Sequence, residues 1–97
     1  ITNCLAYNNG RHGYNIVTGS KFIDIINNTS VNNGFGNTTF DPKSGNGCGI
    51  TIQNNLLYGT SDINIINNGI MNNEKAGICL NDVYNINIYK FCINDKL

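Results

Sequence analysis

Two cations and a histidine in this sequence have types and spacing that could serve binding chemistry. Arg11 stands two residues before Gly13, and Lys75 stands two residues before Gly77, so both cations hold the same place relative to a glycine. Cations at a regular separation can bind carboxylates repeated along an extended anionic polymer. The alternative is that both are solvated residues of surface turns. His12, the only imidazole of the chain, follows Arg11 directly.

An internal repeat sets the place of these residues. Residues 1–10 (ITNCLAYNNG) align with residues 25–34 (IINNTSVNNG), 24 positions later, and the pattern returns at residues 65–73 (IINNGIMNN), another 40 positions on. Behind each copy come two more short segments, of which the first opens with a glycine. Each segment holds three to five residues that alternate between apolar and polar. That alternation is the period of a strand, and the segments are too short for helices.

The repeat predicts an all-β fold, a right-handed parallel β-helix, in which each strand pairs with its copy one coil later. Residues 1–97 would form one domain of three to four coils, with a repeat period of 23 or 24. Coils about 4.8 Å apart would place Arg11 and Lys75 about 9.6 Å from each other. Ten residues should point inward: Ile23, Ile25, Ile50, Ile52, Ile63, Ile65, Ile78, Leu80, Ile86 and Ile88.

Asparagine, present 21 times, is expected at the corners of the coils. It tolerates left-handed backbone angles and can hydrogen-bond to its copy above and below. Cys4, Asn28 and Asn68 fall in one such column, so this ladder should be interrupted at the first coil. Neither end shows a capping helix or a polar closing repeat. We therefore expect a fragment that lacks caps, whose end faces are covered by neighbouring chain or by another copy of itself.

One coil is longer than the others, because the third copy of the pattern follows the second by 40 positions instead of 24. We assign the surplus to a loop insertion at residues 35–48. Insertions in solenoid proteins leave from one face, which is often the binding face. Phe35 or Phe40 could stack on a sugar ring. Alternatively, both could fold back to close a small core of the loop itself.

Composition limits the partners and cofactors. Only 12% of the residues are charged, with six basic and six acidic side chains, so nucleic acid and anionic membranes are not expected as partners. No apolar stretch approaches the roughly 18 residues of a membrane span. The spacings of the four cysteines match no CxxC-type site, and no metal ligand is predicted. We expect the cysteines to be small buried core residues, with a disulfide as the alternative.

Residues 6–18, AYNNGRHGYNIVT, resemble the AYxNDRHGFNVVT segment of the catalytic modules of mannuronan C5-epimerases, which modify alginate. The similarity continues through residues 49–53 and 62–88, and the Arg-His-Gly-aromatic-Asn run is its specific part. The resemblance implies a pectate-lyase-like β-helix that acts on an acidic, uronate polysaccharide and is secreted or at the cell surface. No cofactor is evident in the sequence, and the resemblance allows Ca²⁺.

The resemblance makes His12 the candidate catalytic base, and Arg11, Lys75, Tyr14 and Asn15 the candidate substrate-binding residues. Inverting C5 of a uronate removes a weakly acidic proton beside a carboxylate. Cations must therefore neutralise that carboxylate, while a base and an acid work on opposite faces of the sugar. A polysaccharide lyase shares the first half of this chemistry. In contrast to the family, Asn81 stands where a groove lysine is found, and the family's Tyr-Gly-x-Asp-Pro-His segment would precede residue 1.

No second acid or base is evident, so this piece alone is not expected to be active. The sequence leaves open whether the chain is an enzyme and, if so, whether it is a C5-epimerase, which is an isomerase, or a lyase. The rival interpretation is a non-catalytic β-helix, either an adhesin or spike segment or a sugar-binding remnant, in which Arg11 and His12 form an ordinary corner. The periodicity supports both interpretations, and only the Arg-His-Gly run favours the enzyme.

Overall fold

The computed structural model describes residues 1–36, 47–54, 59–90 and 92–94. Within these residues the chain forms ten strands and no helix, so the all-β prediction is confirmed there. The described part accordingly holds no helix long and apolar enough to cross a membrane. The strands are β1 (Leu5–Tyr7), β2 (Tyr14–Val17), β3 (Lys21–Ile26), β4 (Thr29–Val31), β5 (Cys48–Gln53), β6 (Ser61–Ile66), β7 (Gly69–Met71), β8 (Ala76–Asn81), β9 (Tyr84–Tyr89) and β10 (Cys92–Asn94).

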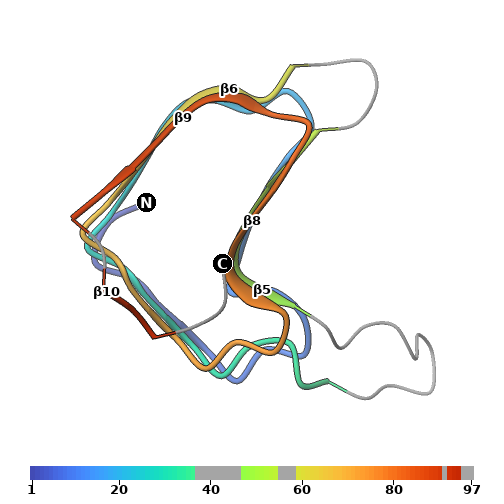
Figure 1. Cartoon of the computed structure of the whole chain (residues 1–97), viewed down its shortest axis with the longest axis vertical. Coiled ribbons are helices and arrows are strands. Elements are labelled where there is room, and N and C mark those ends of the chain that lie inside the picture. Colours follow the sequence, from blue (N-terminus) through green and yellow to red (C-terminus); the bar gives the residue numbers. More distant parts are fainter. Residues whose placement is uncertain (37–46, 55–58, 91, 95–97) are drawn as a thin grey trace.

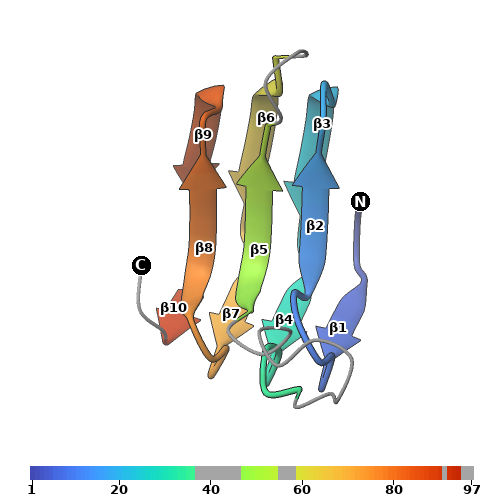
Figure 2. The ribbon, with the colours of Figure 1, turned by 90° about the vertical axis from the view of Figure 1, so that its right-hand side faces the viewer.

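The strands lie in three parallel sheets that the chain visits in turn. β1, β4, β7 and β10 form one sheet in that order, β2, β5 and β8 form a second, and β3, β6 and β9 form the third. One passage through the three sheets is called a coil below. Figure 1 looks along the stacked coils, and Figure 2 shows β2, β5 and β8 side by side. This topology is consistent with the predicted parallel β-helix.

The register of the strand pairs shows where the long coil gains its extra length. β1 pairs with β4 so that Leu5 lies beside Thr29, and this offset matches the predicted period. The offset is larger on both sides of β5, where Ile50 lies between Tyr14 of β2 and Ile78 of β8. Most of the surplus therefore lies before β5, and a smaller part lies after it.

The predicted loop insertion at 35–48 is therefore wrong in its bounds. Cys48 already belongs to β5, and part of the surplus lies between β5 and β6. Residues 37–46, which include Phe40, and residues 55–58 lie outside the described residues.

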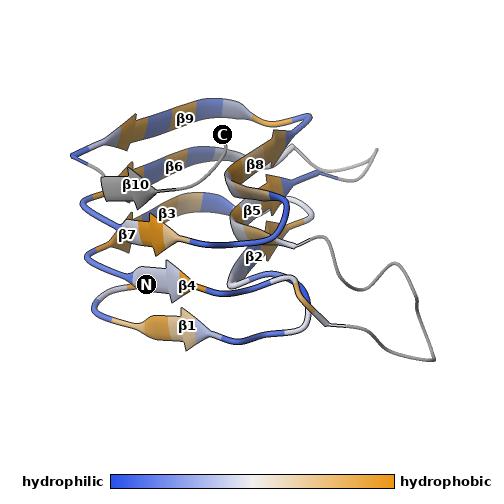
Figure 3. Ribbon diagram, turned by 60° about the horizontal axis from the view of Figure 1, so that its bottom comes forward, coloured by the Kyte–Doolittle hydropathy of each residue, from blue (hydrophilic) through white to orange (hydrophobic). Residues whose placement is uncertain are grey.

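Isoleucine side chains fill the interior between the three sheets. Ile78 is 7% exposed, while Ile23, Ile86 and Ile88 are partly buried and pack against the same cluster. Leu80 is 47% exposed because β8 is the last strand of its sheet. Figure 3 shows the apolar bands along the strands and the polar turns between them. The most deeply buried of the predicted inward residues, at no more than 1% exposed, are Ile25, Ile50, Ile52, Ile63 and Ile65.

Asparagine takes left-handed backbone angles at the corners of the coils, as the sequence predicted. Among residues other than glycine, asparagine adopts this conformation at low cost because its short polar side chain can hydrogen-bond locally. The left-handed asparagines, with φ between 52° and 56°, are Asn3, Asn8, Asn27, Asn32, Asn67, Asn72 and Asn85.

A second set of asparagines forms buried ladders inside the corners. Asn28 Nδ2 donates to Asn68 Oδ1 at 3.1 Å, and Asn33 Nδ2 donates to Asn73 Oδ1 at 2.9 Å. At the first coil, Cys4 contributes its backbone N–H instead, which donates to Asn28 Oδ1 at 2.9 Å. The predicted interruption of this ladder is thus confirmed. These bonds satisfy polar groups that would otherwise be buried without partners.

Candidate functional site

The turn before the β2–β5–β8 sheet brings Arg11 and Lys75 into one column. A Cβ on Gly47 would lie 1.7 Å from the carbonyl oxygen of Arg11, so the two backbones are in contact. On the other side of Gly47, the backbone N–H of Lys75 donates to the Gly47 carbonyl at 2.9 Å. Gly47 therefore lies between Arg11 and Lys75, which share one column, as counting back from Gly13 and Gly77 predicted. We call Arg11, His12 and Lys75 the cationic turn.

Glycines allow the close packing of this turn. A Cβ on Gly13 would lie 2.1 Å from Ser30 Oγ, and a Cβ on Gly49 would lie 2.7 Å from Asn73 Nδ2. Real Cβ contacts are essentially never that short, so only glycine lets the chain pass this close to the buried asparagine ladder. This explains why the second segment of the first two repeats opens with glycine, at Gly13 and Gly49.

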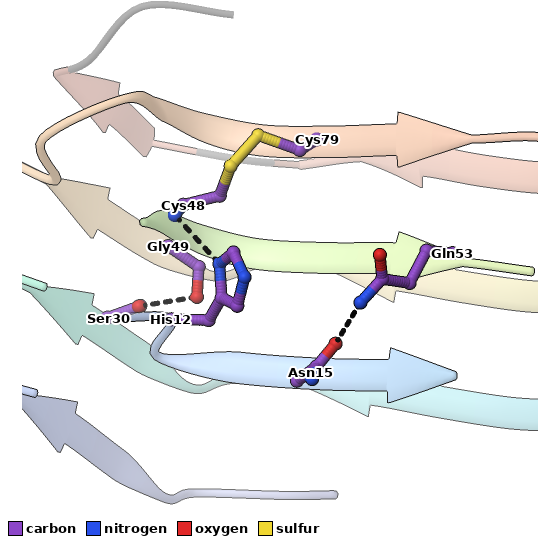
Figure 4. The surroundings of a disulfide bond; sticks show 7 residues. All are labelled: His12, Asn15, Ser30, Cys48, Gly49, Gln53 and Cys79. Carbon is purple, nitrogen blue, oxygen red and sulfur yellow. Dashed lines mark hydrogen bonds between the residues drawn. A yellow bond between two sulfur atoms is a disulfide. The ribbon is translucent and has the colours of Figure 1, made fainter. Parts of the chain in front are cut away.

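His12 is held by a backbone amide of the next coil. The Cys48 N–H donates to His12 Nδ1 at 3.0 Å (Figure 4). Burial is the main reason why the pKa of His12 lies below its usual value of 6.5, and the charges of Arg11 and Lys75 lower it further. A neutral ring whose Nδ1 accepts this bond carries its hydrogen on Nε2.

Arg11 and Lys75 are both exposed to solvent. Neither forms an ion pair with a carboxylate among the residues that the structure describes. After burial, the charges of Arg11 and then Lys75 are the further causes that lower the pKa of His12. Two exposed cations at one turn favour an anionic ligand, with an attraction that salt weakens.

A disulfide between Cys48 and Cys79 anchors the segment that holds His12 (Figure 4). It links β5 to β8, and its two Cα atoms are 6.1 Å apart. The alternative interpretation, a disulfide, therefore holds for this pair, and Cys48 is buried as expected, at 1% exposed. The expectation of a buried core residue is wrong for Cys4, which is free and exposed. The side chain of Cys92 lies outside the described residues.

Asn15 and Tyr14 point to opposite sides of β2. Asn15 is exposed, and its Oδ1 accepts a hydrogen bond from Gln53 Nε2 at 3.2 Å, on the face that carries His12 (Figure 4). Tyr14 is partly buried against the isoleucine core, and its hydroxyl donates to the Thr29 carbonyl at 3.2 Å. Burial, with the Cys4 thiol as the lesser cause, raises the pKa of the Tyr14 hydroxyl above its usual value. The structure thus brings Asn15, but not Tyr14, to the surface of the cationic turn.

Gln53 is a further polar residue that reasoning from the sequence did not single out. The alternation of the strand could have indicated it, because Ile52 faces inward and Gln53, the next residue of β5, must therefore face outward. Thr51, two residues before Gln53 and on the same face of the strand, is only 5% exposed. Asn15 and Gln53 are thus two neutral hydrogen-bonding groups on the outer face of this sheet.

A hollow of about 400 Å³ begins at Gly10, the residue before Arg11. Phe35 lines it and is 57% exposed, and the side chains of the outer asparagines Asn32 and Asn72 line it as well. An exposed aromatic ring beside amide groups is suited to stacking on a sugar ring. The stacking role of Phe35 stays a prediction.

No group of three or more His, Cys, Asp or Glu side chains is placed to hold a metal ion within the described ranges. A ligand set for the Ca²⁺ that the resemblance allows therefore cannot be assigned there.

Comparison of the chain with protein-family models, with curated proteins and with solved structures gives no match. Its function has to be inferred from the chemistry of the cationic turn and the groups beside it.

Proposed function

We propose that this chain is part of a right-handed parallel β-helix that binds an acidic, uronate polysaccharide across the cationic turn. The observation that carries the proposal is the stacking of Arg11 and Lys75 on either side of Gly47, with His12 beside them. A guanidinium and an ammonium group both bind carboxylates, the first as a fork and the second as a point charge. Their separation of two coils, about 9.6 Å, suits carboxylates spaced along an extended polymer.

Neutral groups support a saccharide rather than a simple anion as the ligand. Asn15 and Gln53 lie on the same face as His12 and can exchange hydrogen bonds with sugar hydroxyls. Phe35 lines the hollow on the other side of Arg11 and offers a stacking surface. A uronate polymer presents carboxylates, hydroxyls and sugar rings, which are the three kinds of group that this surface suits.

The resemblance to mannuronan C5-epimerases supports the further proposal that a complete protein would act on its polymer as an epimerase or a lyase. One observation favours the rival, a non-catalytic binding function. His12 Nδ1 is occupied by the Cys48 amide, so the ring as placed has no free lone pair with which to act as a base. The role of His12 as a base remains a prediction.

Location and assembly are also proposals. Disulfides persist in oxidising compartments, so the Cys48–Cys79 bond supports a secreted or cell-surface protein. Apolar side chains are exposed on the first and last coils, among them Leu5 at 61% and Leu80 at 47%. We propose that adjoining chain or another copy covers these faces, because open strand edges and apolar rungs tend to pair.

A binding titration with an oligomannuronate tests the proposed function. Arg11→Ala and Lys75→Ala should each weaken binding about fivefold at low salt, as expected for an exposed charge contact of about 1 kcal/mol. Lys21→Ala is the matched control, because it removes an exposed lysine from β3 in another sheet. Binding that is unaffected by the first two variants, or that is weakened equally by all three, would contradict the proposal.

Catalysis is tested separately by incubating a longer chain, in which upstream coils are restored, with polymannuronate in heavy water, because this piece alone is not expected to be active. Deuterium at C5 without chain cleavage indicates epimerisation, and new ultraviolet absorbance from an unsaturated sugar end indicates lysis. Binding without either signal supports the non-catalytic function.

A further inference from the structure

The surroundings of His12 define how its imidazole ring can act. The Cys48 amide donates to Nδ1, and a backbone N–H can only donate. Nδ1 must therefore keep its lone pair for this bond, and the hydrogen of the neutral ring sits on Nε2. If Nδ1 took up a proton, it would face the Cys48 hydrogen and the bond would be lost.

The charges around the ring act in the same direction. Arg11 on the same turn and Lys75 on the third coil are the charged groups that act on His12, and both are positive. An imidazolium would be a third cation at this turn. The ring is also partly buried, so its charged form would lose part of its hydration.

We propose that the Cys48 amide holds His12 as a neutral imidazole that offers its Nε2–H to an anionic or hydroxyl oxygen of the sugar. His12 would then be a binding residue rather than a base. This inference rests on the proposed function for the identity of the ligand. The neutral ring would then act like the two cations, because all three donate hydrogen bonds to the carboxylate.

The Cys48–Cys79 disulfide has a place in this arrangement as a positioning element. Cys48 carries both the amide that meets Nδ1 and the sulfur that is bonded to β8 (Figure 4). The bond ties the first strand residue of β5 to the next coil, and so restricts movement of the amide away from the ring. Removing it should let the amide separate from Nδ1, which would allow the ring to exchange its tautomer and take up a proton more easily.

Nitrogen NMR of the free protein tests the first half of the proposal. Because His12 is the only histidine, its two ring nitrogens can be assigned without ambiguity. Above the pKa of the ring, we expect the hydrogen on Nε2 and none on Nδ1. A hydrogen on Nδ1, or rapid exchange between both nitrogens, would overturn the proposal without touching the proposed function.

Two substitutions of His12 separate a donor from a base. His12→Gln keeps an N–H donor at a similar reach but cannot accept the C5 proton, whereas His12→Ala removes both functions. We expect the alanine variant to bind an oligomannuronate about tenfold more weakly and the glutamine variant to bind within about threefold of the native chain. Alanine and native chains that bind equally well would overturn the donor role. Absence of binding by every variant, including the native chain, would overturn the donor role together with the proposed function.

The role of the disulfide is tested by the same spectrum in the Cys48→Ala/Cys79→Ala variant, with Cys4→Ser as the control. In the double variant we expect signals from both tautomers and a pKa closer to that of an unrestrained histidine, while Cys4→Ser should match the native spectrum. A double variant that stays folded with Nε2–H unchanged would refute the positioning role. If that variant does not fold, the comparison is made on the folded native chain after mild reduction.

Discussion

Removing the disulfide should destabilise the fold by an amount that can be estimated from its place in the chain. Cys48 and Cys79 are 31 residues apart, and the closed segment runs from β5 in the second coil to β8 in the third. Restricting a loop of that length in the unfolded chain corresponds to about 3.7 kcal/mol at 25 °C. A domain of this size has a total stability of roughly 5–15 kcal/mol, so the loss would be a large part of it.

Urea unfolding measures this difference directly. Cys48→Ala/Cys79→Ala should unfold at a midpoint about 2 M lower than the native chain, given a denaturant slope of about 2 kcal/mol per molar for a domain of this size. Treating the native chain with a reductant should shift the midpoint by a similar amount. Cys4→Ala should leave the midpoint unchanged, because Cys4 is exposed and not bonded to another cysteine.

Oxidised and reduced chains that unfold at the same urea concentration would refute stabilisation by the disulfide. Reaction of Cys48 and Cys79 with a thiol reagent in the folded, oxidised protein would refute the disulfide itself, because a bonded pair offers no thiol.

Four further tests address single features of the fold and the site. Gly47→Ala should lower the unfolding free energy by roughly 3 kcal/mol, since its Cβ would lie 1.7 Å from a carbonyl oxygen of the first coil. Gly69→Ala, where a Cβ meets nothing within 4 Å, should lower the unfolding free energy by less than about 1 kcal/mol, as measured by thermal unfolding. Asn33→Ala, which removes a fully buried rung of a ladder, should cost roughly 2–4 kcal/mol in urea unfolding, and an unchanged midpoint would contradict the ladder's role. Asn67→Ala should cost about 1 kcal/mol because φ is 53° there, whereas Asn67→Gly should be nearly neutral. Stability should fall as the pH drops below about 6.5, since the unfolded chain takes up a proton before His12 does in the fold, and His12→Gln should remove that part of the pH dependence.

The periodic features of the molecule could be predicted from the sequence because each coil has the same corners, inward positions and close backbone contacts as the one before it. Asparagine at the left-handed corners, isoleucine facing inward and glycine before the second strand all recur in register. For the same reason, counting back from a glycine placed Arg11 and Lys75 in one column. This prediction required no knowledge of their contacts, because equivalent positions of successive coils stack in a regular β-helix.

The unique features could not be predicted in this way. The repeat period gives only the total number of extra residues in the long coil. How these residues are divided between the segments before and after β5 decides which residues lie beside Cys48. The disulfide depends on that division. The hydrogen bond to His12 depends on it as well, and its donor is a backbone amide that carries no side-chain signature. Tyr14, by contrast, could have been placed correctly, because it alternates in phase with the buried Ile16 and so had to face inward.

An NMR titration of the isotope-labelled chain with a mannuronate oligomer, and with the same oligomer after reduction of its carboxylates to alcohols, tests the central claim most directly. We expect the acidic oligomer to shift the signals of Arg11, His12 and Lys75, with Asn15 and Gln53 following, and the shifts to shrink as salt is added. The carboxylate-free oligomer should shift them far less. Equal shifts with both oligomers, or shifts confined to residues away from the cationic turn, would contradict the assignment of this turn as a uronate-binding site.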